Sequence, residues 1–469
     1  MRLEVTLVTQ AECVSRKVNV NVTELIDTIP MTGYQIGICI LCICVMLLDG
    51  FDNMIIGLAA PQIARALHLG PAALGVVFSS GHFGFMVGAL GFGTLADRWG
   101  RKRMLISCAL IFSCAMLLTT QITSVEQLAI CRFLTGLGLG GAVPNSLAFG
   151  SEYAPRRLRA SIASLMWVGM PGGATLAGLA AAYVLPRYSW QTVFWLGGFA
   201  PLIAVAVLFL ALPESLAFLV RQDKDKAQVR RIVERISPAT LAGTEDVEFS
   251  TSEEKLPGVP VKHLFTQGRA VMTVLIFVLF YLSFLLIQFM MSWNPSLMRA
   301  SGASIQQYSF AFALLNFGNV VATIIIGKFM DKFNSFLIMA CTFILAAISL
   351  SAFGFMLHSA FAIVVTLSVL TGFFVAASNS GMMAFAATSY PVSIRATGIG
   401  WAYGAGRVGA ITGPLLGGIL LAWHWSFFAI CSFMGLAGVL GAIAILLLKQ
   451  NSARVARRSE VAKVATAGS

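Results

Sequence analysis

The chain has 469 residues, of which 58% are hydrophobic and 11% charged, and its mean hydropathy is +0.83. Soluble domains carry about 25% charged residues, so this composition excludes an ordinary water-soluble protein and indicates a protein embedded in lipid. The formal net charge of +12 would suit a nucleic-acid binder, but the basic residues follow the ends of apolar segments instead. We therefore expect membrane lipid and no nucleic acid as a partner.

The N-terminal segment 1–33 is polar and of mixed charge, so we do not expect it to be a cleavable signal peptide. After it come apolar stretches of about 18–25 residues, each long enough to cross a bilayer as a helix. Twelve such spans are predicted, at 34–57, 72–94, 104–122, 127–150, 160–183, 190–212, 270–292, 305–327, 335–357, 360–387, 397–420 and 426–448. The predicted fold class is therefore an all-α polytopic membrane protein.

The first span contains two carboxylates, in the stretch "VMLLDGFDNMIIG". Asp49 and Asp52 are three residues apart and share one helix face, with Asn53 beside them and Gly50 leaving room for close approach of another helix or a ligand. An aspartate at this depth costs about 2.5–3.5 kcal/mol, so the face is predicted to point into the bundle. Desolvation and the neighbouring like charge favour protonation, which predicts a proton carrier; a structural salt bridge is the alternative.

The fourth span contains one arginine, Arg132, in "RFLTGLGLGGA". Counting 1.5 Å per residue from the outer ends of the spans places Arg132 about 9 Å deep and Asp49 about 8 Å deep. If the two spans are neighbours, Arg132 can sense the charge of the acidic pair. We predict a coupling role for Arg132; snorkelling toward the surface is the alternative.

The middle segment, 213–269, separates six spans from six. Its first half is predicted to form a short basic amphipathic helix, and the rest a linker. The expected organisation is a leader at 1–33, a six-helix bundle at 34–212, a central loop at 213–269, a second bundle at 270–448 and a tail at 449–469.

The basic residues are distributed unequally between the two ends of the spans. The leader, alternate loops, middle segment and tail hold 27 of the 32 Lys and Arg residues, and the opposite loops hold three, Arg65, Arg187 and Arg299. The positive-inside rule therefore predicts that both termini and the middle segment are cytoplasmic.

The two halves of the chain repeat each other. Asp97 in "GTLADRWGRKR", after the second span, matches Asp331 in "GKFMDKF", after the eighth, at an offset of 234. Arg159 after the fourth span matches Arg395 after the tenth, at an offset of 236. A duplicated six-helix unit of this kind forms a central cavity that opens alternately to each side, which favours a transporter over an enzyme.

Two motifs resemble a known superfamily. "GTLADRWGRKRML" (93–105) matches the loop signature G-x-L-a-D-r-x-G-R-k of the major facilitator superfamily, and "RFLTGLGLGGA" (132–142) is similar to its fourth-span motif. The resemblance implies two pseudo-symmetric six-helix bundles around a substrate site. It covers nearly the whole chain after about residue 20 and indicates little about the substrate.

A narrower resemblance rests on "DGFD" in the first span. Its pattern D-G-x-D resembles the aromatic acid:proton symporter family, which imports benzoate-like carboxylates into bacteria, and the leader (22–35), "PESLAFL" (213–219) and "GRVGAITGPLLGG" (406–418) are similar to that family too. The spacing within 409–418 also resembles an antiporter motif of the fifth span. Here it lies in the eleventh span, so we do not infer antiport from it.

In a symporter of this kind, Arg407 is the natural ligand for a carboxylate. It is the one basic residue within a span of the second half, it lies near mid-depth, and its guanidinium matches a carboxylate through two hydrogen bonds. Spans 7 to 12 contain no Asp or Glu. We predict that Arg407 binds the substrate carboxylate; a fixed pairing with a protein acid is the alternative.

The aromatic ring of a substrate needs an apolar wall with a few polar atoms. The aromatic candidates in the second half are Phe280, Phe284, Phe373 and Phe374. The substrate-binding residues expected besides Arg407 are Asn53, Tyr281, Gln288, Asn316, Asn319, Asn379, Trp401 and Tyr403.

The superfamily resemblance also implies an ionic latch at the cytoplasmic side, formed in the outward-open state. Its expected members are Gly93, Asp97, Arg98, Gly100, Arg101, Glu152, Asp331 and Arg395. The same positive charges fix the topology, and the two roles are compatible.

The resulting hypothesis is a proton-coupled importer of a monocyclic aromatic carboxylate in the bacterial inner membrane, functional as a monomer. Neither an enzyme activity nor a cofactor or metal is expected, because no phosphate-binding loop, metal-ligand cluster or catalytic triad occurs. Three alternatives stay open: a symporter of another organic anion such as a dicarboxylate or shikimate-like acid, a membrane sensor of aromatic acids, and a membrane enzyme. The exact acid and the number of protons also stay open.

Overall fold

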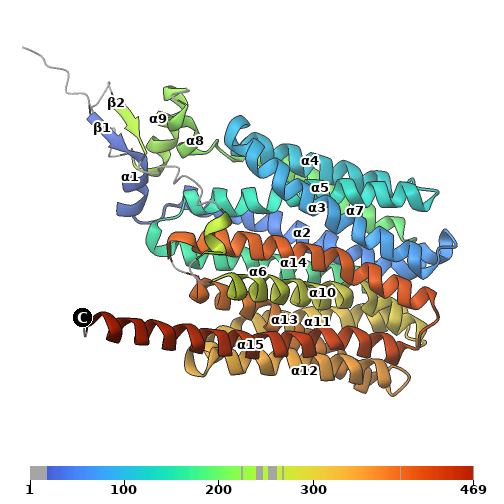
Figure 1. Cartoon of the computed structure of the whole chain (residues 1–469). Coiled ribbons are helices and arrows are strands. Elements are labelled where there is room, and N and C mark those ends of the chain that lie inside the picture. Colours follow the sequence, from blue (N-terminus) through green and yellow to red (C-terminus); the bar gives the residue numbers. More distant parts are fainter. Residues whose placement is uncertain are drawn as a thin grey trace, which may run out of the picture.

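The protein is a bundle of long, nearly parallel helices with a small group of short elements at one end (Figure 1). The computed structural model describes residues 18–222, 225–238, 247–251, 261–266, 269–390 and 392–467. The long helices within these ranges are α2 (Gly33–Ala66), α3 (Pro71–Trp99), α4 (Arg101–Thr119), α5 (Val125–Glu152), α6 (Arg156–Val184), α7 (Gln191–Ala211), α10 (Ala270–Ala300), α11 (Ile305–Lys332), α12 (Ser335–Phe355), α13 (Phe361–Ser389), α14 (Val392–Ala422) and α15 (Phe427–Ala467).

Eleven of these helices are long and apolar enough to cross a membrane. The other, α5, has 28 residues, which is long enough, but it carries Arg132 and several glycines and is less apolar. It packs against α3 and α4 and is therefore an integral helix of the bundle. The structure therefore has the all-helical, multi-pass fold that the sequence predicts.

The helices form two bundles with the same internal packing. In the first bundle, α2 packs on α6, α3 on α5 and α4 on α7; in the second, α10 packs on α14, α11 on α13 and α12 on α15. Each pair occupies the same place in its six-helix unit. The repeat extends to side chains, because Arg159 Nε donates to the oxygen of Ala154 (3.1 Å) and Arg395 Nε to that of Tyr390 (3.3 Å), five residues back in both cases.

The glycine between the two acids of α2 lies against α6. A Cβ atom at Gly50 would overlap the backbone oxygen of Met170. Small residues allow helix backbones to approach closely in membranes. Of the two roles expected for Gly50, close approach of a helix is the one that the structure contains.

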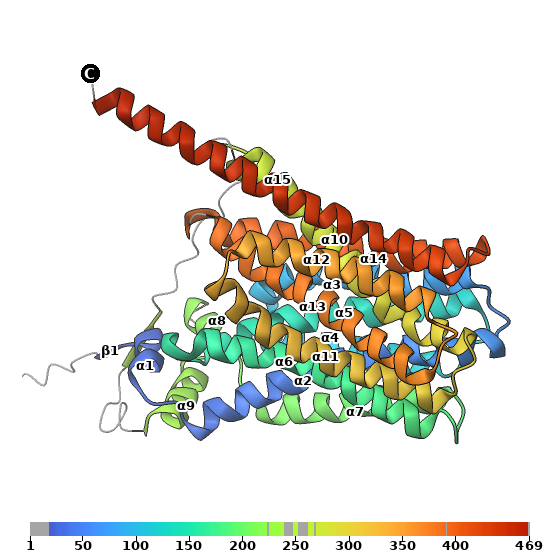
Figure 2. The same ribbon diagram turned by 90° about the horizontal axis from the view of Figure 1, so that it is seen from below.

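The contacts between the bundles involve α3 with α14, α6 with α11, and α2 with α10. We call the end of the bundle at which β1 and the last turns of α15 lie the terminal end, and the other the opposite end (Figure 2). Ser79 Oγ donates to the oxygen of Ile411 (2.7 Å), and Tyr308 Oη to that of Leu58 (3.4 Å). Both contacts lie in the half of the helices nearer the opposite end, so the bundles are closed there.

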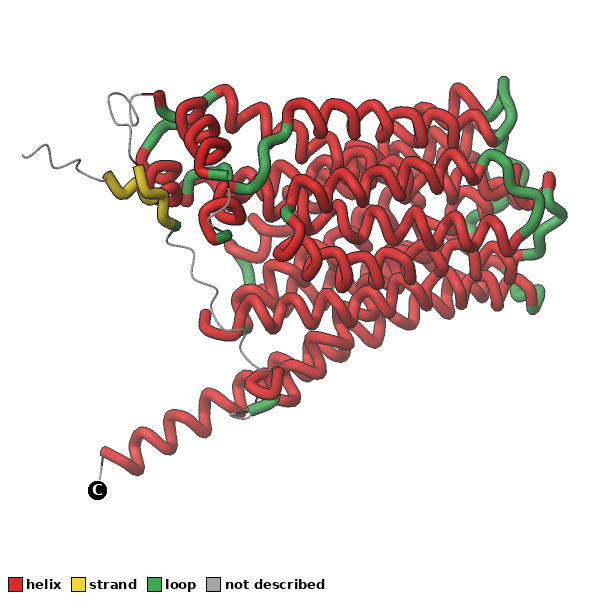
Figure 3. The backbone as a smooth tube through the Cα atoms, turned by 90° about the horizontal axis from the view of Figure 1, so that it is seen from above, coloured by secondary structure: helices red, strands yellow, loops and turns green. Residues whose placement is uncertain are grey.

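Short elements gather at the terminal end, where the tube in Figure 3 shows the strands. They are β1 (Val18–Asn21), α1 (Val22–Thr28), α8 (Leu216–Arg221), α9 (Lys226–Ile236), β2 (Val247–Ser250) and a 3-10 turn (Val261–Leu264). The predicted basic amphipathic helix is α9, which buries one apolar face. The pairing of β1 with β2 in parallel is a difference from the linker and polar leader that were predicted.

The last helix is longer than its predicted span. α15 continues from Phe427 to Ala467, so most of the expected tail is helical (Figure 2). The segment beyond Leu448 is rich in Ala, Arg and Lys, which are strong helix formers.

Candidate functional site

A small cavity lies in the first bundle, next to the second. Its volume is about 40 Å³, which is room for two or three water molecules. Helices α2, α3, α5 and α10 supply its polar wall, formed by Asp49, Asp52, Asn53, His82, Arg132 and Ser292. The structure thus brings together the three residues predicted for proton coupling, with Asn53 beside them.

Asp52 and Arg132 form a buried ion pair across α2 and α5. Arg132 Nη1 lies 3.1 Å from Asp52 Oδ1, and the two side chains are 4% and 5% exposed. Arg132 Nη2 also donates to Thr135 Oγ1 (3.0 Å), and the ring of Phe194 lies 5.6 Å from the guanidinium. The charge of Arg132 is therefore balanced within the first bundle.

Asp49 differs from Asp52. Its side chain is completely buried, and among the described residues neither Oδ1 nor Oδ2 has a hydrogen-bond partner. Asp49 interacts electrostatically with Arg407 of the second bundle. Burying an ionised carboxylate without donors is unfavourable, so this position is suited to a group that gains and loses a proton.

Arg407 lies at mid-depth on α14 and is surrounded by aromatic rings. The centroids of Phe85, Tyr403 and Phe284 lie 3.8, 4.8 and 5.7 Å from its Cζ atom. Arg407 Nη2 donates to Tyr403 Oη (2.7 Å), and in the described part of the chain Nε has no partner. Since Arg407 is 6% exposed, a buried cation here has spare donors.

Two other predicted substrate residues lie near Arg407. Tyr403 and Phe284 pack edge to face, with centroids 5.2 Å apart. Gln288 follows Phe284 by one helical turn on α10, and Ser292 of the cavity follows Gln288 by another, so the three side chains share one face. This face of α10 connects the rings around Arg407 with the cavity around Asp49.

The remaining predicted side chains contact their own bundle. Tyr281 Oη accepts from Thr412, Asn379 donates to Ser283, Asn316 donates to the oxygen of Phe312, and Asn319 donates to Asn316 Oδ1. These amides form contacts within α11 and between α13 and α10. Trp401 is half exposed, and none of the described contacts joins it to Arg407.

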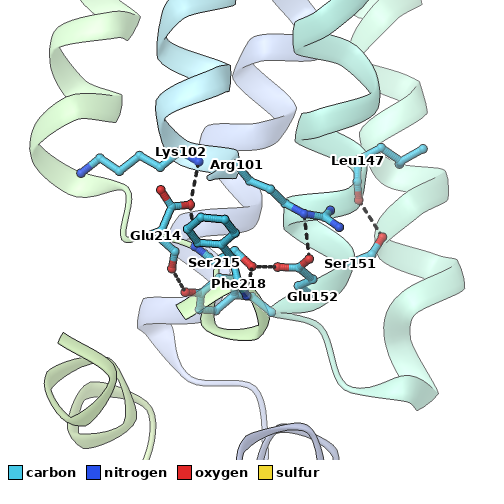
Figure 4. Close-up of polar contacts among 9 residues, drawn as sticks. Arg101, Lys102, Leu147, Ser151, Glu152, Glu214, Ser215 and Phe218 are labelled. Atoms are coloured by element: carbon cyan, nitrogen blue, oxygen red, sulfur yellow. Dashed lines mark hydrogen bonds and ion pairs between the residues drawn. The ribbon is translucent and has the colours of Figure 1, made fainter. Parts of the chain in front are cut away.

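The terminal end of the first bundle contains a polar network (Figure 4). Arg101 Nε lies 3.0 Å from Glu152 Oε1, and Ser215 Oγ donates to Glu152 Oε2 (2.5 Å). Glu214 Oε1 accepts the backbone N–H groups of Lys102 and Ser215, both at 2.9 Å. Together these contacts tie the start of α4, the end of α5 and the start of α8.

Backbone geometry explains one glycine of this network. Gly100 has φ +100°, a conformation that favours glycine, and a Cβ atom there would crowd the carboxylate of Glu214. Tyr153 Oη donates to the backbone oxygen of Glu214 (2.8 Å), and burial raises the pKa of Tyr153 well above its usual range. Tyr153 is therefore a neutral donor here.

The other predicted latch residues are placed as follows. Arg98 and Asp331 are exposed on α3 and α11, and Arg395 caps Tyr390. Gly93 lies within α3 with open space beside it. The side chain of Asp97 lies outside the described residues. The structure thus joins Arg101 to Glu152 within one bundle and leaves Arg98 and Asp331 in solvent.

Three residues of these sites were not predicted. His82 lines the cavity, Phe85 contacts Arg407, and Glu214 caps α4. A histidine inside an apolar span is itself a signal of function, and it could have been used. Phe85 carries no signal, because one phenylalanine among 34 is indistinguishable by sequence.

Comparisons with known proteins extend this description. The family model described as Major Facilitator Superfamily matches residues 42–298 and 273–467. The 4-hydroxybenzoate transporter PcaK of Pseudomonas aeruginosa is 34% identical over 427 residues, which cover 91% of this chain and 95% of that protein. The 3-(3-hydroxy-phenyl)propionate transporter of Escherichia coli is 33% identical over 429 residues, covering 90% and 94%. A crystal structure of the D-xylose-proton symporter has the same fold, with a TM-score of 0.69 at 16% identity, covering 88% of this chain and 97% of that one.

Proposed function

We propose that this chain, which belongs to the Major Facilitator Superfamily and within it to the aromatic acid transporters, imports a monocyclic aromatic carboxylate together with protons. One observation carries the proposal: Arg407 is buried at mid-depth among aromatic rings and lacks a carboxylate hydrogen-bond partner among the described residues. A substrate with one carboxylate and one ring would satisfy both the spare donors and the apolar wall.

The relatives support this substrate class. PcaK and the Escherichia coli protein are named for 4-hydroxybenzoate and 3-(3-hydroxy-phenyl)propionate, and each of these acids combines one aromatic ring with one carboxylate. Arg407 would hold the carboxylate, with Tyr403, Phe284 and Gln288 around the ring. Membership of this family also agrees with the prediction of a transporter rather than an enzyme.

The complete burial of Asp49 without hydrogen-bond partners among the described residues supports proton coupling, and the charge of Arg407 favours the ionised form of this acid. In the empty carrier, an ionised Asp49 is stabilised by the charge of Arg407. When a substrate carboxylate binds Arg407, that stabilisation is lost and Asp49 takes up a proton. By linkage, a proton on Asp49 favours substrate binding by the same factor. Asp52 keeps Arg132 as its partner throughout and positions the site.

The orientation follows from charge. The terminal end carries most of the basic residues, so we place it in the cytoplasm of a bacterial cell, with both termini inside. The inter-bundle contacts nearer the opposite end, such as Ser79 with Ile411, then support an inward-open conformation. When the terminal ends approach each other, the residues around Arg101 and Glu152 would form the cytoplasmic gate.

The test is uptake by purified protein in proteoliposomes with an imposed pH gradient. We expect accumulation of labelled 4-hydroxybenzoate, benzoate or a related acid when the outside is acidic, and collapse of accumulation when a protonophore is added. The neutral amide of the same ring is the matched control and should not accumulate. Accumulation of the acid that is unaffected by the gradient would refute proton coupling, and no transport of any acid in such a panel would refute the substrate class.

A further inference from the structure

The contact between Phe85 and Arg407 joins the two bundles. Phe85 lies on α3 of the first bundle and Arg407 on α14 of the second, and the guanidinium Cζ is 3.8 Å from the ring centroid. Both side chains are nearly buried, at 5% and 6% exposure. At this distance a guanidinium stacks on a ring, and the attraction is strongest when water is excluded.

The other two rings belong to the same bundle as Arg407. Tyr403 lies one turn before it on α14, and Phe284 lies on α10. These rings move with Arg407 whenever one bundle rocks against the other. Of the three rings around Arg407, Phe85 is thus the one whose contact with the guanidinium depends on the relative position of the two bundles.

A proton-coupled importer must return to its starting conformation without substrate. In that step Arg407 has lost the hydrogen bonds to the substrate carboxylate, and burying a guanidinium whose donors lack acceptors is unfavourable. Within its described residues, the second bundle offers no nearby carboxylate to balance this charge. Its predicted spans contain no Asp or Glu, and Asp331, between two of them, is exposed at the terminal end. Asp49 attracts Arg407 but makes no hydrogen bond to it.

We propose that Phe85 is a positioning residue that holds Arg407 by a cation–π contact in the empty carrier and yields it to the carboxylate when substrate binds. This inference rests on the proposed function, since it assigns Arg407 the substrate carboxylate. The ring stabilises the guanidinium during the return step. It also competes with the substrate for the same cation.

The proposal predicts opposite effects on two steps of the cycle. Without the ring, the empty carrier returns slowly, while the loaded carrier, in which the carboxylate stabilises Arg407, is unaffected. Substrate binding becomes tighter, because its competitor is gone. A residue that only packed the bundles, or that stacked on the substrate ring, would weaken binding or slow both steps alike.

The experiment compares net uptake with exchange for Phe85→Leu in proteoliposomes. Exchange of external labelled substrate for internal unlabelled substrate uses the loaded carrier in both directions and omits the empty return. We expect net uptake to fall about ten- to thirtyfold, the size of a desolvated cation–π contact. Exchange should stay within about twofold of the wild type, and substrate KM should fall.

Two further variants serve as controls. Phe85→Tyr keeps the face of the aromatic ring, so its net uptake should be close to that of the wild type. Phe78→Leu removes another ring of α3 that reaches the second bundle, at a centroid distance of 5.4 Å from Trp293, but without a cation. This variant should change net uptake and exchange by the same factor.

An equal loss of both transport modes in Phe85→Leu, a raised KM, or failure of Phe85→Tyr to restore net uptake would overturn the inference. These outcomes differ from a failure of the proposed function, in which the wild-type protein itself shows no proton-driven uptake of aromatic acids. Exchange activity also reports that Phe85→Leu is folded and inserted.

Discussion

The two buried arginines of the central region are stabilised in different ways. Arg132 in the first bundle pairs with the carboxylate of Asp52 at 3.1 Å and donates to Thr135. Arg407 in the second bundle has three aromatic rings around it and donates to the hydroxyl of Tyr403. Both are nearly inaccessible to solvent, so burial does not distinguish them.

The difference separates a structural charge from an available one. A buried ion pair has little to gain from a ligand, since each charge already has its partner. A guanidinium held by rings keeps its hydrogen-bonding directions free for an incoming carboxylate. The same contrast separates the two acids, because Asp52 is hydrogen-bonded to Arg132 and Asp49 has no hydrogen-bond partner among the described residues.

The largest effect is expected from Asp49→Asn. With one proton per substrate, a gradient of two pH units supports about 100-fold accumulation, and without a proton carrier the ratio falls to about 1. Exchange should survive, because asparagine mimics the protonated acid. Asp52→Asn should impair accumulation and exchange together, since it leaves the buried charge of Arg132 unpaired. Both modes are measured in the same proteoliposomes, with detergent-extracted protein compared by thermal unfolding.

These two variants test the assignment of Asp49 as the proton carrier and of Asp52 as the fixed partner of Arg132. Accumulation by Asp49→Asn at the wild-type level would remove its carrier role. Loss of accumulation with intact exchange in Asp52→Asn instead of Asp49→Asn would show that the two acids have been assigned in the wrong order.

A second, smaller effect is expected from Arg407→Ala. Removing a charge-assisted contact to the substrate costs about 1.5–3 kcal/mol, so the dissociation constant for an aromatic acid should rise about ten- to hundredfold. The neutral amide of the same ring should lose much less. Binding is measured by competition with a labelled acid. Arg407→Lys keeps the charge but loses the planar pair of donors, so its dissociation constant for the acid should lie between those of the wild type and Arg407→Ala.

Arg132→Lys is the matched change in the other bundle. It preserves the charge facing Asp52, and we expect the affinities for acid and amide to change by similar factors. Equal losses for acid and amide in Arg407→Ala would contradict the carboxylate contact.

Much of the fold could be predicted from the sequence, because long apolar stretches have one stable form in a bilayer. The repeat was visible as well: the matched pair Arg159 and Arg395 makes the same backbone contact in both halves. The pairing of β1 with β2 was not predicted. Both segments alternate between apolar and polar residues, as VNVN and VEFS, but each has only four residues and they lie more than 200 residues apart, so the sequence does not show that they pair. The helical extension of α15 was missed because it is polar and was assigned to a tail.

The site was partly predictable for the same reason. Charges inside apolar spans are costly and therefore conspicuous, which identified Asp49, Asp52, Arg132 and Arg407. Which acid pairs with which base depends on side-chain placement across helices, and sequence spacing does not contain it. Uncharged residues such as Phe85 gain their role from a neighbour in the other bundle, and only the structure shows that neighbour.

The smallest effect tests the polar partners of the two arginines. Tyr403→Phe removes the hydroxyl that accepts from Arg407 Nη2 and keeps the ring, whereas Thr135→Val removes the hydroxyl that accepts from Arg132. Because each guanidinium keeps its other partners, we expect the loss of one hydroxyl acceptor to cost about as much as a typical hydrogen bond, which is about a three- to tenfold change in an equilibrium constant.

If the first bundle binds the proton and the second binds the substrate, the loss of one hydroxyl in Tyr403→Phe and in Thr135→Val should affect different transport parameters. Tyr403→Phe should alter the KM for the acid at every external pH by one factor, because it acts on the residue that binds the carboxylate. Thr135→Val should leave the KM at saturating proton concentration unchanged and shift the pH dependence of uptake, because it acts beside the acidic pair. A pH shift in Tyr403→Phe as large as that in Thr135→Val would mean that the two cations form one coupled site.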